Sequence, residues 1–102
     1  MGVSFHPSAE EELGAAAAWY EEQRSSLGTA LLDEVHRAVA VIAESPSRWP
    51  RWPGLPRSLG VQRFLLTRFP YALAYRMRGN ALLVLAVAHV RRRPGYWRHR
   101  AG

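Results

Sequence analysis

The segment from Ala81 to Ala88 is apolar at every position. A short apolar run bounded by turn residues is typical of a β-strand that is covered on both faces. Gly79-Asn80 directly precedes it, and a two-residue turn of this kind joins antiparallel strands. The run is far shorter than the roughly 20 residues that a membrane helix needs. We therefore predict a central strand over about 81–90, preceded by an antiparallel strand over about 71–78.

Two helices are predicted upstream of this sheet. Ser8, followed three residues later by Glu11, has the pattern of a capping box, so the first helix is expected to begin there and to end near Arg24. Apolar residues spaced by three or four predict a second helix from about 26 to 44. It is expected to end at Ser45-Pro46, because the residue before proline avoids helical backbone. Two such helices form an antiparallel hairpin.

The remaining segments complete a single α+β domain over residues 1–102. Val3 to Phe5 is predicted as an initial strand, and about 61–68 as the first of three later strands. Residues 46–60 are rich in proline and glycine and are expected to form a loop that its two tryptophans hold against the body. The order is strand, helix, helix, strand, strand, strand. It predicts a helical hairpin packed on a mainly antiparallel sheet.

Charge divides the chain sharply at residue 45. All eight carboxylates precede it, whereas twelve of the fourteen arginines follow it, giving formal balances of −6 and +12. Carboxylates on helices are expected to be mostly solvated. The basic part should meet an anionic partner, and both nucleic acid and an acidic protein segment satisfy that condition. The absence of cysteine is compatible with a reducing cytoplasm, where we expect the protein to act.

Candidate chemistry concentrates after the apolar run. The four histidines show no metal-ligand spacing, and cysteine is absent, so neither a metal site nor a cofactor is predicted. His89 suits either a general base or a structural hydrogen bond at the strand end, and we favour the structural role. Trp97 is expected to pack the C-terminal segment onto the sheet. The guanidinium groups of the C-terminal arginines are expected to bind an anionic partner. These are Arg91, Arg92, Arg93, Arg98 and Arg100.

Several motifs, taken in order, resemble the RelE/ParE superfamily of bacterial type II toxin–antitoxin toxins, often called plasmid stabilisation proteins. The resemblance spans nearly the whole chain. It is carried by Phe5-His6-Pro7-Ser8-Ala9-Glu10-Glu11-Glu12-Leu13, Trp19-Tyr20, Arg63-Phe64, Phe69-Pro70-Tyr71, Tyr75, Leu85-Ala86-Val87-Ala88-His89 and Arg93-Pro94-Gly95-Tyr96-Trp97.

This resemblance implies a toxin that a cognate antitoxin neutralises, with two alternative mechanisms. The ParE-like branch, which we favour because of the long helical hairpin, inhibits DNA gyrase and is not a nuclease. The RelE-like branch is a metal-independent endonuclease that cuts mRNA at the ribosome. In that case Arg63 and Arg93 would hold the phosphate, and His89 or Tyr96 would handle the proton. The lysines of many RelE-type enzymes are missing here.

A wider set of residues is predicted to contact the target or the antitoxin. An acidic antitoxin segment should cover the arginines, and strand addition to an exposed sheet edge is one mode of docking. No membrane partner is expected. The predicted contact residues are Arg68, Arg76, Arg91, Arg92, Arg93, Trp97 and Arg98.

Overall fold

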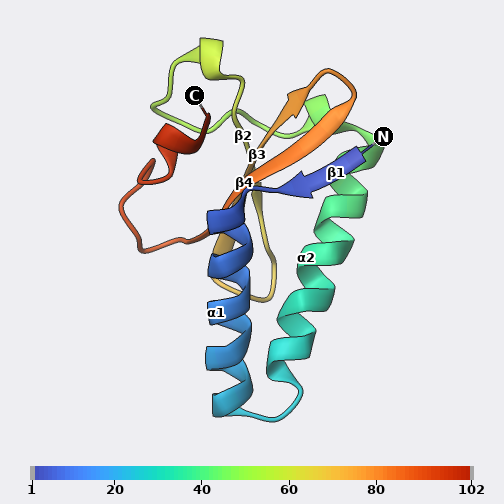
Figure 1. Ribbon diagram of the computed structural model, residues 1–102, viewed down its shortest axis with the longest axis vertical. Helices are drawn as coiled ribbons and strands as arrows, with labels where there is room; N and C mark the ends of the chain where they lie inside the picture. Colours follow the sequence, from blue (N-terminus) through green and yellow to red (C-terminus); the bar gives the residue numbers. More distant parts are fainter. Residues whose placement is uncertain (1, 102) are drawn as a thin grey trace.

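The computed structural model describes residues 2–101, which form a four-stranded sheet with a helical hairpin against one face (Figure 1). The main elements are β1 (Gly2–Phe5), α1 (Pro7–Gln23), α2 (Leu27–Glu44), β2 (Gln62–Leu65), β3 (Tyr71–Arg78) and β4 (Ala81–His89). Three short 3-10 helices cover Pro46–Arg48, Arg57–Leu59 and Arg98–Ala101. The predicted α+β class and order of elements are confirmed.

The strand order is β1-β4-β3-β2. β1 runs parallel to β4, with Phe5 opposite Val84, and the other two pairings are antiparallel. β2 is shorter than the predicted 61–68. β2 ends at Leu65, and in the connection that follows Glu34 of α2 accepts hydrogen bonds from the amides of Thr67 (2.8 Å) and Arg68 (3.2 Å).

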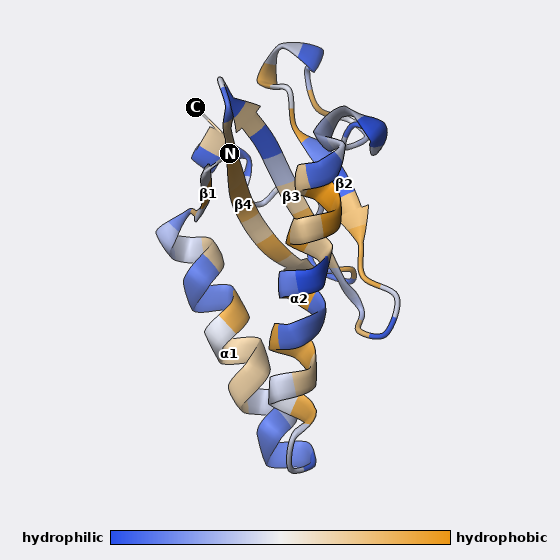
Figure 2. Ribbon diagram, turned by 90° about the vertical axis from the view of Figure 1, so that its right-hand side faces the viewer, coloured by the Kyte–Doolittle hydropathy of each residue, from blue (hydrophilic) through white to orange (hydrophobic). Residues whose placement is uncertain are grey.

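Both faces of β4 are covered, as its sequence predicts. One face packs against the helices in a core that includes Leu13, Leu31, Ile42 and Val84. The other face packs against the tryptophan loop and the C-terminal segment. Figure 2 shows hydrophobic colours along most of the length of β4. Among the described residues, no helix is long and apolar enough to cross a membrane.

The first helix begins differently from the prediction. His6, not Ser8, occupies the N-cap position, and its Nδ1 accepts a hydrogen bond from the amide of Ser8 at 3.1 Å. Pro7 is the first helical residue. Proline suits that position because its fixed φ angle is helical and its missing N–H would have no partner there. The helix therefore starts before Ser8, and the predicted capping box is wrong.

A carboxylate of α1 closes the helical hairpin. Glu21 accepts hydrogen bonds from the amides of Ser26 (2.8 Å) and Gly28 (3.0 Å), which lie at the start of α2. These bonds hold the pKa of Glu21 below its ordinary value, the bond from Ser26 having the largest effect. The turn needs a positive φ of 74° at Ser26. Gly28 lies so close to α1 that a Cβ atom there would overlap the carbonyl oxygen of Ala17.

Candidate functional site

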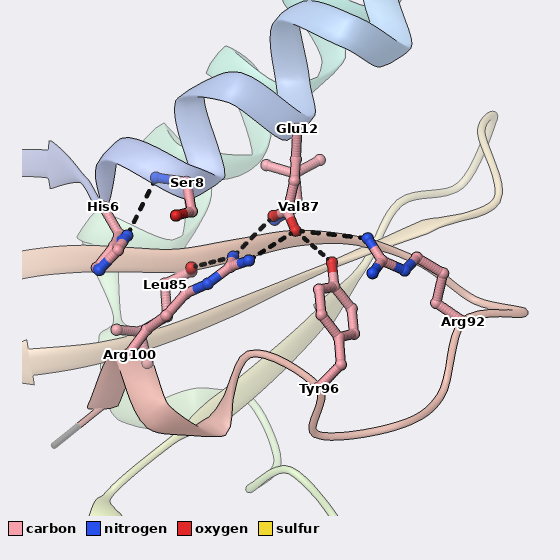
Figure 3. Close-up of polar contacts among 8 residues, drawn as sticks. All are labelled: His6, Ser8, Glu12, Leu85, Val87, Arg92, Tyr96 and Arg100. Atoms are coloured by element: carbon pink, nitrogen blue, oxygen red, sulfur yellow. Dashed lines mark hydrogen bonds and ion pairs between the residues drawn. The ribbon is translucent and has the colours of Figure 1, made fainter.

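Glu12 of α1 is the centre of a polar cluster that ties the C-terminal segment to the body (Figure 3). Its Oε1 accepts hydrogen bonds from the Val87 amide and from Nη1 of Arg100, both at 3.0 Å. Its Oε2 accepts from the Tyr96 hydroxyl at 2.5 Å and from Nη2 of Arg100 at 3.0 Å. The Glu12 carboxylate therefore binds Tyr96 and Arg100 of the C-terminal segment as well as the central strand. Both of its oxygens accept hydrogen bonds from Arg100.

The sheet topology explains why a carboxylate is needed here. β1 ends at Phe5, opposite Val84, so the rest of β4 has no neighbouring strand on that side. The unpaired edge is served by side chains instead: Glu12 accepts from the Val87 amide, and Arg100 donates to the Leu85 carbonyl at 3.0 Å. Buried backbone groups require such partners. Glu12 and Arg100 thus supply hydrogen bonds that a neighbouring strand would otherwise make with this edge of β4.

The cluster fixes the protonation states of its members. Burial alone would raise the pKa of Glu12, but hydrogen bonds from Arg100, Tyr96 and the Val87 amide outweigh it and hold that pKa below its ordinary value. Burial, together with the hydrogen bond to Glu12, raises the pKa of Tyr96 well above its ordinary value. Glu12 is therefore an anion and Tyr96 a neutral donor at physiological pH.

Two further contacts hold the C-terminal segment on the outer face of the sheet. Trp97 is completely buried, and its ring meets that of Trp52 edge-on with centroids 4.8 Å apart. Nη1 of Arg76, on β3, donates a hydrogen bond to the carbonyl oxygen of Ala101. Residues 90–101, called the tail below, are therefore a packed part of the domain.

A cavity of about 410 Å³ lies between the tail and the outer face of the sheet. Arg63 of β2 and His89 at the end of β4 line it, together with Arg92 and Arg93 of the tail. No carboxylate is among its lining residues. The charged side chains that line this cavity are thus all cationic, and the rest of its lining is neutral.

The fold and this tail allow comparison with known proteins. A family model described as "ParE toxin of type II toxin-antitoxin system, parDE" matches residues 3–94. The chain belongs to the ParE toxin family. This ParE-family chain is accordingly the toxin component of a type II toxin–antitoxin system.

A solved chain of the chromosomal ParDE toxin–antitoxin system from P. aeruginosa shares the fold of this ParE-family toxin. Its TM-score is 0.75 at 18% sequence identity, and the match covers 87% of this chain and 95% of that one. No match was found among curated proteins.

All four residues predicted for a RelE-type reaction line the cavity of this ParE-family toxin. Arg63, His89 and Arg93 all line it. Tyr96 also lines it, but its hydroxyl is bound to Glu12. Nδ1 of His89 accepts a hydrogen bond from the Arg91 amide at 3.1 Å, and the His89 ring lies edge-on to Tyr71 at 5.1 Å. His89 thus has the structural environment that its position at the strand end favours.

The predicted contact residues separate into two groups. Arg68, Arg91, Arg93 and Arg98 have exposed side chains, and so does Arg92, which is 56% exposed and 3.9 Å from Glu12. The other two make structural contacts within the domain, and their contact with a partner stays a prediction. Trp97 has no exposed surface to offer a partner, and Arg76 is bound to the tail carbonyl.

Sequence reasoning missed Glu12 and the structural role of Arg100. Glu10, Glu11, Glu22, Asp33 and Glu44 are exposed, as expected of helix carboxylates, but Glu12 is not. The helical spacing did contain a signal, because Glu12 follows Ala9 by three residues and precedes Ala16 by four, and both alanines are buried. Among residues 2–101, no three histidine or carboxylate side chains gather to hold a metal ion.

Proposed function

We propose that this ParE-family toxin inhibits DNA gyrase in the cytoplasm and that a cognate antitoxin neutralises it by covering the tail. The observation that carries the proposal is the set of exposed tail arginines on a fixed framework. Arg91, Arg93 and Arg98 are exposed, and the ion pairs found among residues 2–101 involve only Arg92 and Arg100. Such a surface steers and binds an acidic protein partner.

The state of the proton-handling groups supports a binding function over RNA cleavage. A general acid or base needs a proton-transfer atom that can reach the substrate. The Tyr96 hydroxyl donates to Glu12, and the Glu12 carboxylate further raises its pKa. Nδ1 of His89 is occupied by the Arg91 amide. The Tyr96 hydroxyl is therefore committed to the fold, and Nε2 is the ring nitrogen of His89 that is left for proton transfer.

The docking of the antitoxin follows from the same surface. The tail and the sheet are rich in arginine, so an antitoxin segment with several carboxylates should lie across them. Strand addition remains a prediction, and the outer edge of β2, where a bridge pairs Arg51 with Gln62, offers room for it.

A supercoiling assay tests the proposed target. Purified toxin is added to gyrase, ATP and relaxed plasmid, and we expect supercoiling to stop near stoichiometric amounts. The variant Arg91→Ala/Arg93→Ala/Arg98→Ala should need at least about tenfold more protein, because steered association depends on these charges. The matched control is Arg24→Ala/Arg37→Ala/Arg57→Ala, which removes three exposed arginines from outside the tail.

A translation reaction run in parallel distinguishes the alternative. Full supercoiling in the presence of excess toxin, together with mRNA cleavage that Arg63→Ala abolishes, would replace gyrase inhibition by the RelE-type mechanism. The antitoxin part of the proposal is tested separately, by titrating the antitoxin protein encoded beside the toxin gene. An antitoxin that fails to bind or to restore supercoiling would contradict it.

A further inference from the structure

The cavity beneath the tail has an apolar interior and an apolar entrance. Ala72 and Ala88, on β3 and β4, are buried at its base, where their small side chains leave space. Leu65 and Val90 line it as well, and each is 53% exposed. Large apolar side chains exposed together at the mouth of a hollow are typical of an interaction site.

The charged groups of the cavity all have the same sign. Arg63, Arg92 and Arg93 line it from β2 and from the tail, and no aspartate or glutamate does. Arg92 makes an ion pair with Glu12 at 3.9 Å, whereas none is formed by Arg63 or Arg93 among the described residues. An occupant should therefore combine an apolar group with nearby negative charge.

The aromatic rings around the cavity favour a peptide over a nucleic-acid base. Base recognition needs an open ring face for stacking. The guanidinium of Arg63 lies over Trp52 at 5.7 Å, and that of Arg92 lies over Tyr96 at 3.7 Å. Trp97 has no exposed surface. These rings already stack with arginines or are buried, so the apolar aliphatic surface is what remains for a ligand.

We propose that this cavity is a socket for one bulky apolar side chain of the antitoxin, flanked in the antitoxin sequence by aspartate or glutamate. The inference rests on the proposed antitoxin partnership and adds where the partner is anchored. A volume of about 410 Å³ is at the small end of ligand cavities, which suits one or two side chains. Interfaces concentrate their binding energy in such buried anchors, while the flanking carboxylates pair with the arginine rim.

The test measures the affinity of the toxin for the antitoxin encoded beside it, by calorimetry. Leu65→Asp and Val90→Asp each place a carboxylate at the socket mouth, where it repels the acidic flanks and removes apolar contact. We expect each to weaken binding at least about 30-fold, the loss typical of an interface hot spot. Val41→Asp makes the same change on α2, where Val41 is 42% exposed, and should change the affinity less than about threefold.

A second measurement uses the unaltered toxin. The methyl resonances of Ala72 and Ala88, at the base of the socket, should shift in NMR spectra when antitoxin is added, because the anchor side chain contacts them. Unshifted methyls, or wild-type affinity in both aspartate variants, would overturn the socket while leaving the antitoxin partnership intact. Failure of the wild-type toxin to bind the antitoxin would instead refute the proposed function and the socket together.

Nucleic acid is the competing occupant. A single-stranded RNA or DNA oligonucleotide of about 20 nucleotides is titrated against the same variants. We expect weak binding that salt abolishes and that Leu65→Asp leaves within about threefold of wild type. Oligonucleotide binding that is lost in Leu65→Asp and Val90→Asp, with antitoxin affinity unchanged, would assign the cavity to nucleic acid and overturn the proposal.

Discussion

Glu12 joins the two oppositely charged parts of the sequence in space. It comes from the acidic N-terminal part, yet its partners Arg100 and Tyr96 belong to the basic tail. The Arg100 side chain is only 8% exposed, so its charge would be costly without a carboxylate beside it. The same carboxylate keeps the tail in the position from which its outer arginines face solvent.

Glu12→Gln should therefore destabilise the protein through Arg100. The amide cannot compensate the buried guanidinium, and removing one partner of a buried ion pair costs about 3–5 kcal/mol. We expect a loss of about 3 kcal/mol in the free energy of unfolding, since Gln retains an acceptor for one hydrogen bond. Urea unfolding monitored by circular dichroism measures it. The neighbouring exposed residue provides the control, because Glu11→Gln should stay within about 0.5 kcal/mol of wild type. Equal losses in the two variants would contradict the role of Glu12.

The pH dependence of stability follows from the lowered pKa of Glu12. A carboxyl group with a folded-state pKa below its unfolded value stabilises the fold fully above the unfolded pKa, about 4.3. That stabilisation is lost as the pH falls through the folded-state pKa. The difference in unfolding free energy between wild type and Glu12→Gln should be constant between about pH 5.5 and about pH 9 and shrink on acidification. If this difference in unfolding free energy grew below pH 4, folding would raise the pKa of Glu12 and the prediction would be contradicted.

The helical hairpin depends on one close approach between its two helices. Gly28 lies at the start of α2, against the Ala17 carbonyl, and the Glu21 cap on the Gly28 amide depends on the same proximity. Figure 1 shows the hairpin extending beyond the sheet, so its far end is stabilised by these helix–helix contacts.

Two glycine-to-alanine substitutions should have opposite effects on stability. Gly28→Ala forces α1 and α2 apart, and overpacking of this kind costs about 1–3 kcal/mol. Gly14→Ala, in the exposed interior of α1 with nothing within 4 Å of an added Cβ, should instead stabilise by about 0.5–1 kcal/mol. Thermal unfolding then gives midpoints on either side of wild type, about 4–8 °C apart for each kcal/mol. A Gly28→Ala variant as stable as Gly14→Ala would show that the approach is not needed.

The sequence predicted the elements much better than the side-chain contacts between them. The apolar run at 81–88, the turn at Gly79-Asn80 and the spacing of α2 each report a local property, so the strands and helices were confirmed with only small changes at their ends. The position of Pro7 was a local signal as well, and it overrides the capping pattern at Ser8.

Long-range contacts were beyond the sequence. Glu12 and Arg100 are 88 positions apart, and they meet because α1 packs against β4 and the tail packs on the outer face of the sheet. Arg76 resembled the other arginines because nothing local shows that it faces the Ala101 carbonyl. The sequence therefore identified the tail arginines as a cluster. Which of them are exposed to solvent depends on the tertiary structure.

The whole molecule is elongated, 41 × 28 × 23 Å, with the helices carrying the acidic groups and the sheet and tail carrying most of the arginines. The formal net charge is +6. A molecule with this distribution orients itself in the field of an acidic partner before contact, which raises the association rate.

Association with the antitoxin should accordingly depend on salt through its rate. Screening shortens from about 10 Å at 0.1 M salt to about 3 Å at 1 M. Between 0.05 and 0.5 M NaCl we expect the association rate constant to fall at least about tenfold and the dissociation rate constant to change less than about threefold. Surface plasmon resonance resolves the two. If salt changed only the dissociation rate constant, the charges would act within the bound interface, and the steering of association would be contradicted.

The pairing of β1 with β4 also sets the order in which a newly made chain can mature. During synthesis the helical hairpin can form from neighbouring residues, but Gly2–Phe5 has its strand partner only when 81–84 has left the ribosome. The hydrogen bonds of Glu12 to Tyr96 and Arg100 can form only later, when these two residues have also left the ribosome. The tail surface and the socket therefore form only after residues 90–101 have left the ribosome. An antitoxin that binds this surface therefore meets a chain whose hairpin, sheet and tail are already folded together.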